Sequence, residues 1–179
     1  MKTKLFLALV LVALFVAPLW AKGPNGPSTS SGLTDTEEAN ILYLYEEEKL
    51  AHDIYVAMYR LYGAYIFNNI SESEQRHMDS VAKLISKYEL DDSVIDNDPG
   101  NFTNVIIQGE YDRLLGDGNQ DLTSALEVGV EIEEMDIGDI ERMLEETDKA
   151  DIKRVLSNLL DGSNNHLDAF NTQLGIVPQ

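Results

Sequence analysis

The sequence predicts an all-α fold, a four-helix bundle with a long crossover between the second and third helices. Apolar residues recur every three or four positions in four long stretches, which is the period of one helix face. Three of these stretches begin at residues that commonly cap helices. Residues 89–120 separate the second stretch from the third and are too long for a simple loop, so they predict a crossover along the bundle.

The first 21 residues have the pattern of a secretory signal. Lys2 and Lys4 form a basic start, Leu5 to Ala17 is an apolar run, and a cleavage site follows Ala21. A membrane anchor is the alternative, but the apolar run is short for a membrane span. We therefore expect an exported protein (periplasmic, cell-surface or secreted) whose mature chain has no membrane segment.

Residues 22–33 are rich in Gly, Pro and Ser and predict a flexible linker, which leaves residues 34–175 as one helical domain. Loss of Lys2 and Lys4 with the signal lowers the net charge from −19 to −21, because residues 1–21 contain no Asp or Glu. Such an acidic chain is unsuited to nucleic-acid phosphates. There is no cysteine, so disulfides are excluded and any metal site must use oxygen and nitrogen ligands.

Thr34 and Glu37 form the pattern of a capping box, which predicts that the first helix runs from there to about Tyr62. Glu47 and Glu48 lie on either side of the centre of its apolar stripe. One of them should be buried, and the periodicity does not decide between them. His52 lies at the boundary of the stripe. The stripe consists of Leu44, Ala51, Ile54, Tyr55, Met58 and Tyr62.

Gly63 predicts a sharp reversal, after which an antiparallel second helix runs from about Phe67 to Tyr88. Glu74 and His77 lie on its core side, three residues apart. A buried unpaired charge costs several kcal/mol, so these groups are expected to be paired or bound to a metal. Glu-x-x-His on an inward helix face is a ligand unit of di-iron carboxylate bundles. The alternative is a capping box in which Ser71 caps a helix that begins there and Glu74 reaches back to it.

The connection between the second and third helices predicts a short helix near Asn104–Leu115. Asp117, Asn119 and Asp121 resemble the start of an EF-hand loop. That loop requires Gly at its sixth position and Glu at its twelfth, where this chain has Leu and Val. A turn with Asp121 as the N-cap of the next helix explains the same residues.

The third helix is expected to run from about Asp121 to Thr147. Glu133 and Asp136 lie three residues apart in the middle of its apolar stripe, and Gly129 would let a neighbouring helix approach closely.

The fourth helix is expected to run from an N-cap at Asp148 to about Leu174. Ser163 and His166 lie within its stripe, and Gly162 predicts a kink or close packing, because glycine inside a helix costs stability.

All four helices thus place polar groups on the face that should be buried. Together these groups suit two octahedral ions such as iron or manganese, with zinc as a competitor. The alternative is a hydrogen-bonded network that fixes helix register. The candidate ligands are Glu48 (or Glu47), Glu74, His77, Glu133, Asp136 and His166.

The sequence also resembles the ferritin-like superfamily. Glu48-Lys-Leu-Ala51-His-Asp-Ile-Tyr55 is similar to the first-helix pattern Glu-x-x-Ala-x-x-x-Tyr of ferritins and rubrerythrins, and Glu74-Gln-Arg-His77 is similar to their second-helix Glu-x-x-His. A closer resemblance is to an uncharacterised ferritin-like domain family of unknown function. It covers about Leu33 to Leu174 and includes the runs Glu46-Glu-Glu-Lys-Leu-Ala, Glu133-Glu-Met-Asp-Ile and Gly162-Ser-Asn-Asn-His-Leu-Asp-Ala-Phe170.

The resemblance implies a ferritin-like bundle with a di-iron site, in which Glu48 rather than Glu47 is the ligand and Fe(II) is oxidised by O₂ or peroxide. It also implies a catalytic role for Tyr55, as a donor of a hydrogen bond or an electron, where plain core packing is the alternative. Ser163 stands where rubrerythrins carry a further glutamate. The rival functions are a non-catalytic metal-binding or buffering protein and a structural or interaction domain. The oligomeric state stays open, with a homodimer as one option.

Overall fold

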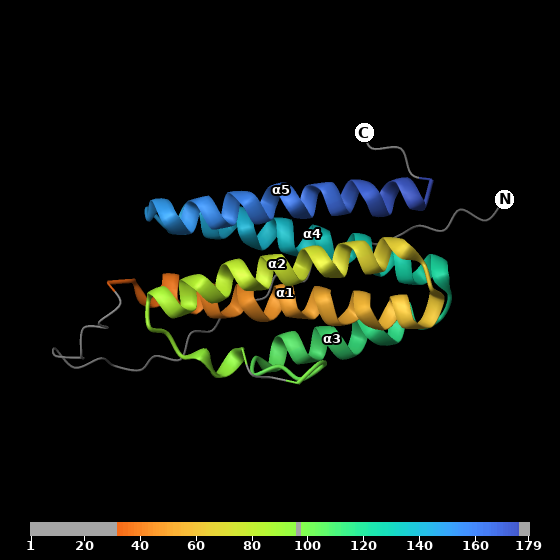
Figure 1. The fold of residues 1–179 in the computed structure, drawn as a ribbon, viewed down its shortest axis with the longest axis horizontal. Helices are drawn as coiled ribbons and strands as arrows, with labels where there is room; N and C mark the ends of the chain where they lie inside the picture. Colours follow the sequence, from red (N-terminus) through yellow and green to blue (C-terminus); the bar gives the residue numbers. More distant parts are fainter. Residues whose placement is uncertain (1–31, 96–97, 176–179) are drawn as a thin grey trace, which may run out of the picture.

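The computed structural model describes residues 32–95 and 98–175, and these residues form five α-helices, one short 3₁₀ turn and no strand (Figure 1). The expected signal at residues 1–21 and residues 22–31 of the expected linker lie outside this described part. The all-α prediction is confirmed. The elements are α1 (Asp35–Tyr62), α2 (Tyr65–Lys87), the 3₁₀ turn η1 (Asp92–Val94), α3 (Val105–Gly118), α4 (Leu122–Glu146) and α5 (Ala150–Gln173).

The four long helices form a bundle in which α1 packs along α2 and α4 packs along α5. The two pairs meet through α1 against α4 and α2 against α5. The shorter α3 lies outside the four, against α1 and α4 (Figure 1). Within the described ranges, no helix is both long and apolar enough to span a bilayer.

Local sequence signals set three of the helix ends. The amide of Glu37 donates to Oγ1 of Thr34 at 3.1 Å and the amide of Thr34 donates to Oε2 of Glu37 at 2.8 Å, so the predicted capping box starts α1. Gly63 ends that helix in the left-handed conformation, at φ +67°, which glycine adopts without steric cost. Asp121 caps α4 by accepting from the amide of Ser124 at 2.8 Å.

Two caps considered for the sequence do not form, although α2 begins close to the expected Phe67 and α5 close to the expected Asp148. Helix α2 begins at Tyr65, so Ser71 lies inside the helix, where its hydroxyl donates to the carbonyl of Asn68, and the alternative capping box with Glu74 does not form. Helix α5 begins at Ala150 after Lys149, without a side-chain cap, so Asp148 is not its N-cap. In both places the packing of the long helices outweighs the local preference of a capping residue.

The core is divided into two apolar clusters with a polar layer between them. Ile41, Leu44 and Ile85 belong to the first cluster, and Ile54 and Phe170 belong to the second. The side chains between the clusters are charged or polar and are nevertheless buried: Glu47, Glu48, Glu74, His77, Glu133, Asp136, Ser163 and His166. The candidate ligands therefore form one layer across the middle of the bundle.

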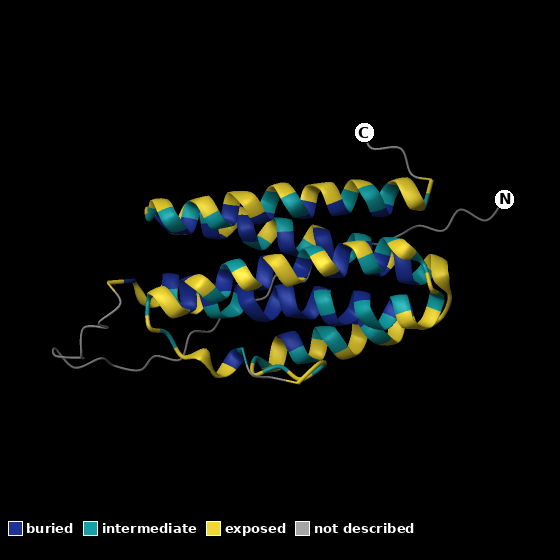
Figure 2. Cartoon of the chain, viewed as in Figure 1, coloured by how far each residue is buried: buried dark blue, intermediate teal, exposed yellow. Residues whose placement is uncertain are grey.

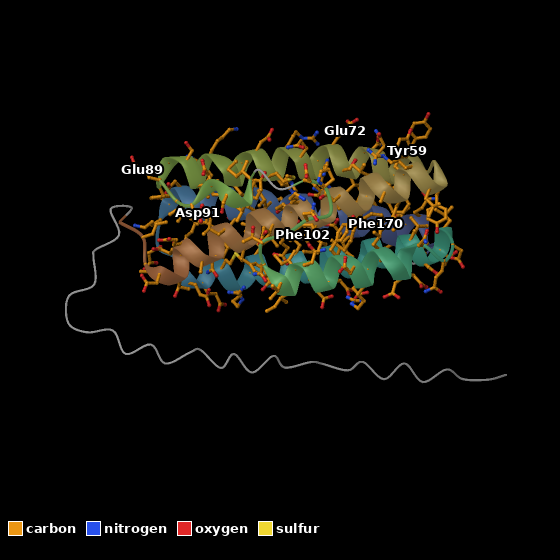
Figure 3. All side chains as sticks on the ribbon, turned by 90° about the horizontal axis from the view of Figure 1, so that it is seen from below. Tyr59, Glu72, Glu89, Asp91, Phe102 and Phe170 are labelled. Atoms are coloured by element: carbon orange, nitrogen blue, oxygen red, sulfur yellow. The ribbon has the colours of Figure 1, made fainter. Side chains whose placement is uncertain are left out.

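The middle of α1 is buried on every side, from Leu44 through Ala51 (Figure 2). The crossover covers the outer face of this segment. The ammonium group of Lys49 donates to Oδ2 of Asp53 at 2.6 Å and to the carbonyls of Asp98 at 3.0 Å and Asn101 at 3.3 Å. It also lies 4.4 Å from the ring centroid of Phe102, which is labelled in Figure 3.

The carboxylate of Glu46 accepts hydrogen bonds from the amides of Thr103 and Asn104 at the start of α3. Helix α3 is thus attached to α1 through charged groups. Because α3 covers the side of α1 that an ordinary bundle would leave to solvent, Glu47 and Glu48 are both buried, whereas the periodicity predicted only one.

Candidate metal centre

Five of the six predicted ligands come together in two groups of three that share one carboxylate. The first group is Glu48, Glu74 and His77, and the second is Glu74, Glu133 and His166. Within each group, one potential ligand atom from every residue lies within 4.8 Å of the others. These five side chains come from all four long helices, and they are groups that can hold a metal ion.

Glu74 joins the two groups through its two oxygens. Its Oε2 lies 2.7 Å from Nδ1 of His77, and its Oε1 lies 2.8 Å from Nδ1 of His166. The remaining carboxylates lie on the outer sides: Oε2 of Glu48 is 3.0 Å from Nδ1 of His77, and Oε2 of Glu133 is 3.5 Å from Nδ1 of His166. Both imidazoles therefore turn the same nitrogen, Nδ1, toward the carboxylates.

The two imidazole rings stack with their centroids 5.6 Å apart. Gly162 lies against the edge of the His77 ring that carries Nε2. A Cβ atom at position 162 would lie 2.6 Å from Nε2 of His77. The glycine that predicted a kink or close packing thus provides the space for this ring. It lets α5 approach α2 at the level of the polar layer.

Tyr55 lies about two turns after Glu48 on α1 and contacts the second group. Its hydroxyl donates to Oε1 of Glu133 at 2.6 Å, and its ring packs against Phe67 and Phe170 in the second apolar cluster. The hydroxyl therefore orients a candidate ligand, while the ring is core.

Asp136, the sixth predicted ligand, is not a member of either group. It is buried and its Oδ2 accepts a hydrogen bond from the hydroxyl of Ser163, which is fully buried. Ser163 occupies the position at which the family resemblance would place a further glutamate. Asp136 on α4, which is shorter than a glutamate, is thus paired with the hydroxyl of Ser163 on α5.

Burial and mutual repulsion shift the pKa values of these carboxyl groups upward. Burial raises the pKa of Glu133 to about 8 despite its contact with His166, and burial raises that of Asp136 to about 7 despite the hydrogen bond from Ser163. Burial, followed by the charge of Asp136, raises the pKa of Glu48 well above its usual range. Burial and the neighbouring Glu133 likewise raise the pKa of the Tyr55 hydroxyl well above its usual range.

Contact between Glu74 and the two histidines lowers the pKa of Glu74 and raises the pKa values of His77 and His166. Burial disfavours the Glu74 carboxylate, but the contacts with His166 and His77 outweigh it and lower the pKa to about 2. Burial also disfavours the charged imidazole of His166, but Glu133 and Glu74 raise its pKa to about 9, and Glu74 raises that of His77. The cluster therefore strongly favours positive charge at its centre.

Several buried atoms in this layer have no hydrogen-bond partner among the described residues: Glu48 Oε1, Glu74 Oε1, Asp136 Oδ1 and His166 Nδ1, together with both oxygens of Glu47. The close approach of His166 Nδ1 to Glu74 Oε1 therefore lacks hydrogen-bond geometry. Buried polar atoms are normally paired, and each exception requires an explanation. Atoms that converge without bonding to one another are what a metal site requires, and carboxylate with imidazole suits iron, manganese or zinc.

Two other sequence candidates do not contribute. His52 is partly exposed, and its Nδ1 lies 2.9 Å from Oδ1 of Asp53. The segment that resembles an EF-hand start is not a loop, since Asp117 lies in α3 and Asp121 caps α4. Conversely, periodicity did not reveal that Glu47 is buried without a partner. Burial and the charges of Asp136, Asp139 and Glu48 raise its pKa well above the usual range.

These features define a class of protein, an all-helical bundle whose core contains acidic and histidine groups able to hold metal. The chain belongs to the family described as "Uncharacterized protein domain (DUF2202)", whose profile matches residues 37–176. The uncharacterized protein MJ0754 of Methanocaldococcus jannaschii is 41% identical over 138 residues, covering 77% of this chain and 75% of that protein. The crystal structure of the hypothetical protein MJ0754 from Methanococcus jannaschii DSM 2661 matches with a TM-score of 0.78 at 39% identity, covering 87% of this chain and 86% of that one.

Proposed function

We propose that this protein is a ferritin-like metalloprotein that binds two transition-metal ions, and that its natural metal is iron. The observation that carries the proposal is the position of Glu74, whose two oxygens face two different histidines at 2.7 Å and 2.8 Å. A carboxylate in that position is suited to bridge two ions. Glu48 with His77 would complete the ligands of one ion, and Glu133 with His166 would complete those of the other.

The charge of the cluster supports this assignment. Glu48, Glu74 and Glu133 are nearly inaccessible to solvent and lie on three different helices, and like charges so placed repel one another. Two divalent cations would neutralise these carboxylates, as would protons on the carboxyl and imidazole groups. Metal ions would therefore replace protons on the same residues, as is usual for protein metal sites.

The unpaired atoms favour a metal centre over a purely structural network. A network that only fixes helix register lowers the energy of the fold when each of its buried atoms is hydrogen-bonded. Glu48 Oε1, Glu74 Oε1 and His166 Nδ1 have no such bond in the described part of the chain. The connectivity, with α1 paired to α2, a long connection and α4 paired to α5, further supports a ferritin-like arrangement.

The activity we propose is oxidation of Fe(II) by O₂ or peroxide. A bound pair of Fe(II) ions would supply two electrons to the oxidant. The chain's own residues hold and shield the site: Tyr55 orients Glu133 through its hydrogen bond, and the apolar clusters on both sides exclude water. From the N-terminal sequence alone, we also propose that the protein works outside the cytoplasm.

Metal content of the purified protein tests the proposal. The mature chain is loaded with Fe(II) without oxygen, desalted and measured by elemental mass spectrometry, beside the variants Glu74→Gln and Glu72→Gln. We expect two irons in the parent and in Glu72→Gln, because Glu72 is exposed on the outer face of α2 (Figure 3), and neither ion bound stably in Glu74→Gln. Equal iron in all three proteins would contradict the shared-carboxylate centre.

Oxygen uptake then separates an oxidase from a metal buffer. Admission of O₂ to the iron-loaded parent should consume oxygen in proportion to bound iron. Two bound irons without consumption of oxygen or peroxide would support the metal centre, contradict the proposed oxidation and favour the buffering function.

A further inference from the structure

Glu47 is a buried acid that the two-ion centre does not use. It is 5% exposed, and both of its carboxylate oxygens lack a hydrogen-bond partner among the described residues. The proposed ligand on the same turn is Glu48, its neighbour in sequence. Successive residues on a helix point about 100° apart, so Glu47 faces another direction than the centre.

That direction leads into a small recess between three helices. Its cavity volume is about 10 Å³, and its walls are Tyr43, Glu47 and Leu50 of α1, Ile107 and Glu110 of α3, and Ile132 and Met135 of α4. About this volume is needed to hold one water molecule, and a single desolvated cation is of comparable size. Tyr43, Glu110 and Met135 are partly exposed and form the rim, whereas Glu47 is the buried acid of the recess.

On its inner side, Glu47 is exposed to the charge of Asp136 on α4. Of the acids whose charges act on Glu47, Asp136 acts most strongly, followed by Asp139 and Glu48. The Asp139 carboxylate lies within reach of Glu47, but the two can share a hydrogen bond only when one of them is protonated. Asp136 also acts on Glu48 more strongly than any other charged group does. Its Oδ2 is bound to Ser163, but its Oδ1 is buried without a partner. Two acids from different helices thus offer free oxygens between the recess and the centre.

The approach to the recess is acidic. Arg113 on α3 lies 2.7 Å from the rim carboxylate of Glu110, 2.7 Å from Glu131 and 3.3 Å from Asp117, so three carboxylates surround one guanidinium group. A concave site lined by one sign of charge raises the local concentration of the opposite ion and speeds its association.

We infer that Glu47 and Asp136 form an intake site, at which a divalent transition-metal cation binds after passing through the recess and from which it moves on to Glu48 and the centre. The inference rests on the proposed two-ion centre and goes beyond it by assigning the route. Both acids are hard oxygen ligands, which bind divalent cations without the imidazole that would retain a transition metal tightly. Such a site binds an ion weakly enough to release it inward.

The test compares the rate of metal loading with the final amount bound. Metal-free mature protein is mixed with Co(II) in a stopped-flow instrument, and the visible absorption of protein-bound Co(II) is followed. Bound metal is then counted by elemental mass spectrometry. Glu47→Gln keeps the shape of the side chain and removes the carboxylate that would bind the cation. Glu134→Gln makes the same change at an exposed position of α4 and is the control.

We expect Glu47→Gln to load about tenfold more slowly or worse and to reach the parent's two ions, while Glu134→Gln loads within about twofold of the parent. Met135→Trp, which narrows the rim without changing a carboxylate, should also slow loading and serves as the second variant if Glu47→Gln does not fold.

Three results would overturn the inference. Parental loading rates in both Glu47→Gln and Met135→Trp, with two ions bound, would show that the ion takes another route while the centre stands. One ion fewer at the end point of Glu47→Gln would make Glu47 a ligand of the centre itself. A parent that retains no metal would remove the proposed function, and the intake site with it.

Discussion

The hydroxyl of Tyr55 lies 2.6 Å from Oε1 of Glu133 and donates a hydrogen bond to it, joining α1 to α4 at the edge of the polar layer. The other oxygen of the same carboxylate, Oε2, lies 3.5 Å from Nδ1 of His166. One end of Glu133 is therefore held by the protein while the other end faces the cluster. The direction of this candidate ligand depends on a residue that is not itself in either group of three.

The first prediction is that Tyr55→Phe weakens metal binding without abolishing it. Loss of a hydrogen bond that orients a ligand typically lowers metal affinity about 10- to 100-fold. The two-ion stoichiometry should persist at saturating metal, and competition with a chromophoric chelator should show one site weakened. Tyr59→Phe, one turn along the same helix and partly exposed (Figure 3), should bind as the parent does. Unchanged affinity in Tyr55→Phe would show that Glu133 needs no such support.

The second prediction concerns the space that Gly162 leaves for His77. In Gly162→Ala the new Cβ would lie 2.6 Å from Nε2 of His77, so the imidazole must move. We expect one of the two ions to be lost or bound at least about tenfold more weakly, as measured by elemental mass spectrometry after gel filtration. Gly138→Ala on α4 is the matched control, since an added Cβ there would meet no atom of another helix within 4 Å. That control should gain roughly 0.5–1 kcal/mol of stability from the better helix former.

The third prediction is that the metal-free protein becomes less stable as the pH rises from 5 to 8. Glu133 has its pKa raised from 4.5 to about 8 and Asp136 from 3.8 to about 7, so over this range the folded state binds protons that the unfolded state has released. Stability that depends on a raised pKa is lost as the pH increases toward that pKa. His166, raised from 6.5 to about 9, acts in the same direction above pH 6.5. Glu74, lowered from 4.5 to about 2, has the opposite sign but acts only below pH 4.5.

Each excess proton changes the free energy of unfolding by about 1.4 kcal/mol per pH unit, which corresponds to roughly 3–6 °C in Tm per pH unit for a domain of this size. Thermal unfolding in a chelator at pH 5, 6, 7 and 8 measures the effect. Added Mn(II) should reverse the trend, because metal binding displaces these protons and becomes stronger as the pH rises. A Tm that stays constant or rises from pH 5 to pH 8 in the presence of the chelator would contradict these pKa shifts.

The fourth prediction is that Lys49→Met severely destabilises the fold. Lys49 is the buried cation that binds Asp53 and two carbonyls of the crossover. Its removal leaves the Asp53 carboxylate buried without this partner, which typically costs about 3–5 kcal/mol. Urea unfolding should show that loss, while Lys83→Met, at an exposed position of α2, should stay within roughly 0.5 kcal/mol of the parent. A small effect at Lys49 would mean that the crossover is held mainly by other contacts.

Much of the helical architecture could be predicted because its signals are local. The capping box at Thr34, the reversal at Gly63 and the cap at Asp121 all lie where the pattern indicated. Five of the candidate ligands could be named because the helical period assigns their positions to the buried face, where a charged side chain is unexpected. The capping preference of aspartate also predicted an N-cap at Asp148, but α5 begins after Lys149 without a side-chain cap, so packing sets its first turn.

The rest of the site depends on tertiary contacts that periodicity does not contain. A pattern with one apolar face implies one buried face, whereas α3 buries the other side of α1 and with it Glu47 and Lys49. Asp136 lies on the core side as predicted, but the hydroxyl of Ser163 on α5 holds one of its oxygens. That pairing follows from the relative rotation of two helices, which no single helix specifies.

The turn from Glu46 to Lys49 has one further consequence, for evolution. Glu46 holds the start of α3, Glu47 lines the recess, Glu48 faces the polar cluster, and Lys49 holds the crossover. Most helices in a bundle keep one side toward water, where substitutions accumulate freely. This turn has no such side, so each change in it requires a matching change on another helix or in the crossover. Among diverging relatives, these four positions should change slowest and in concert with their partners.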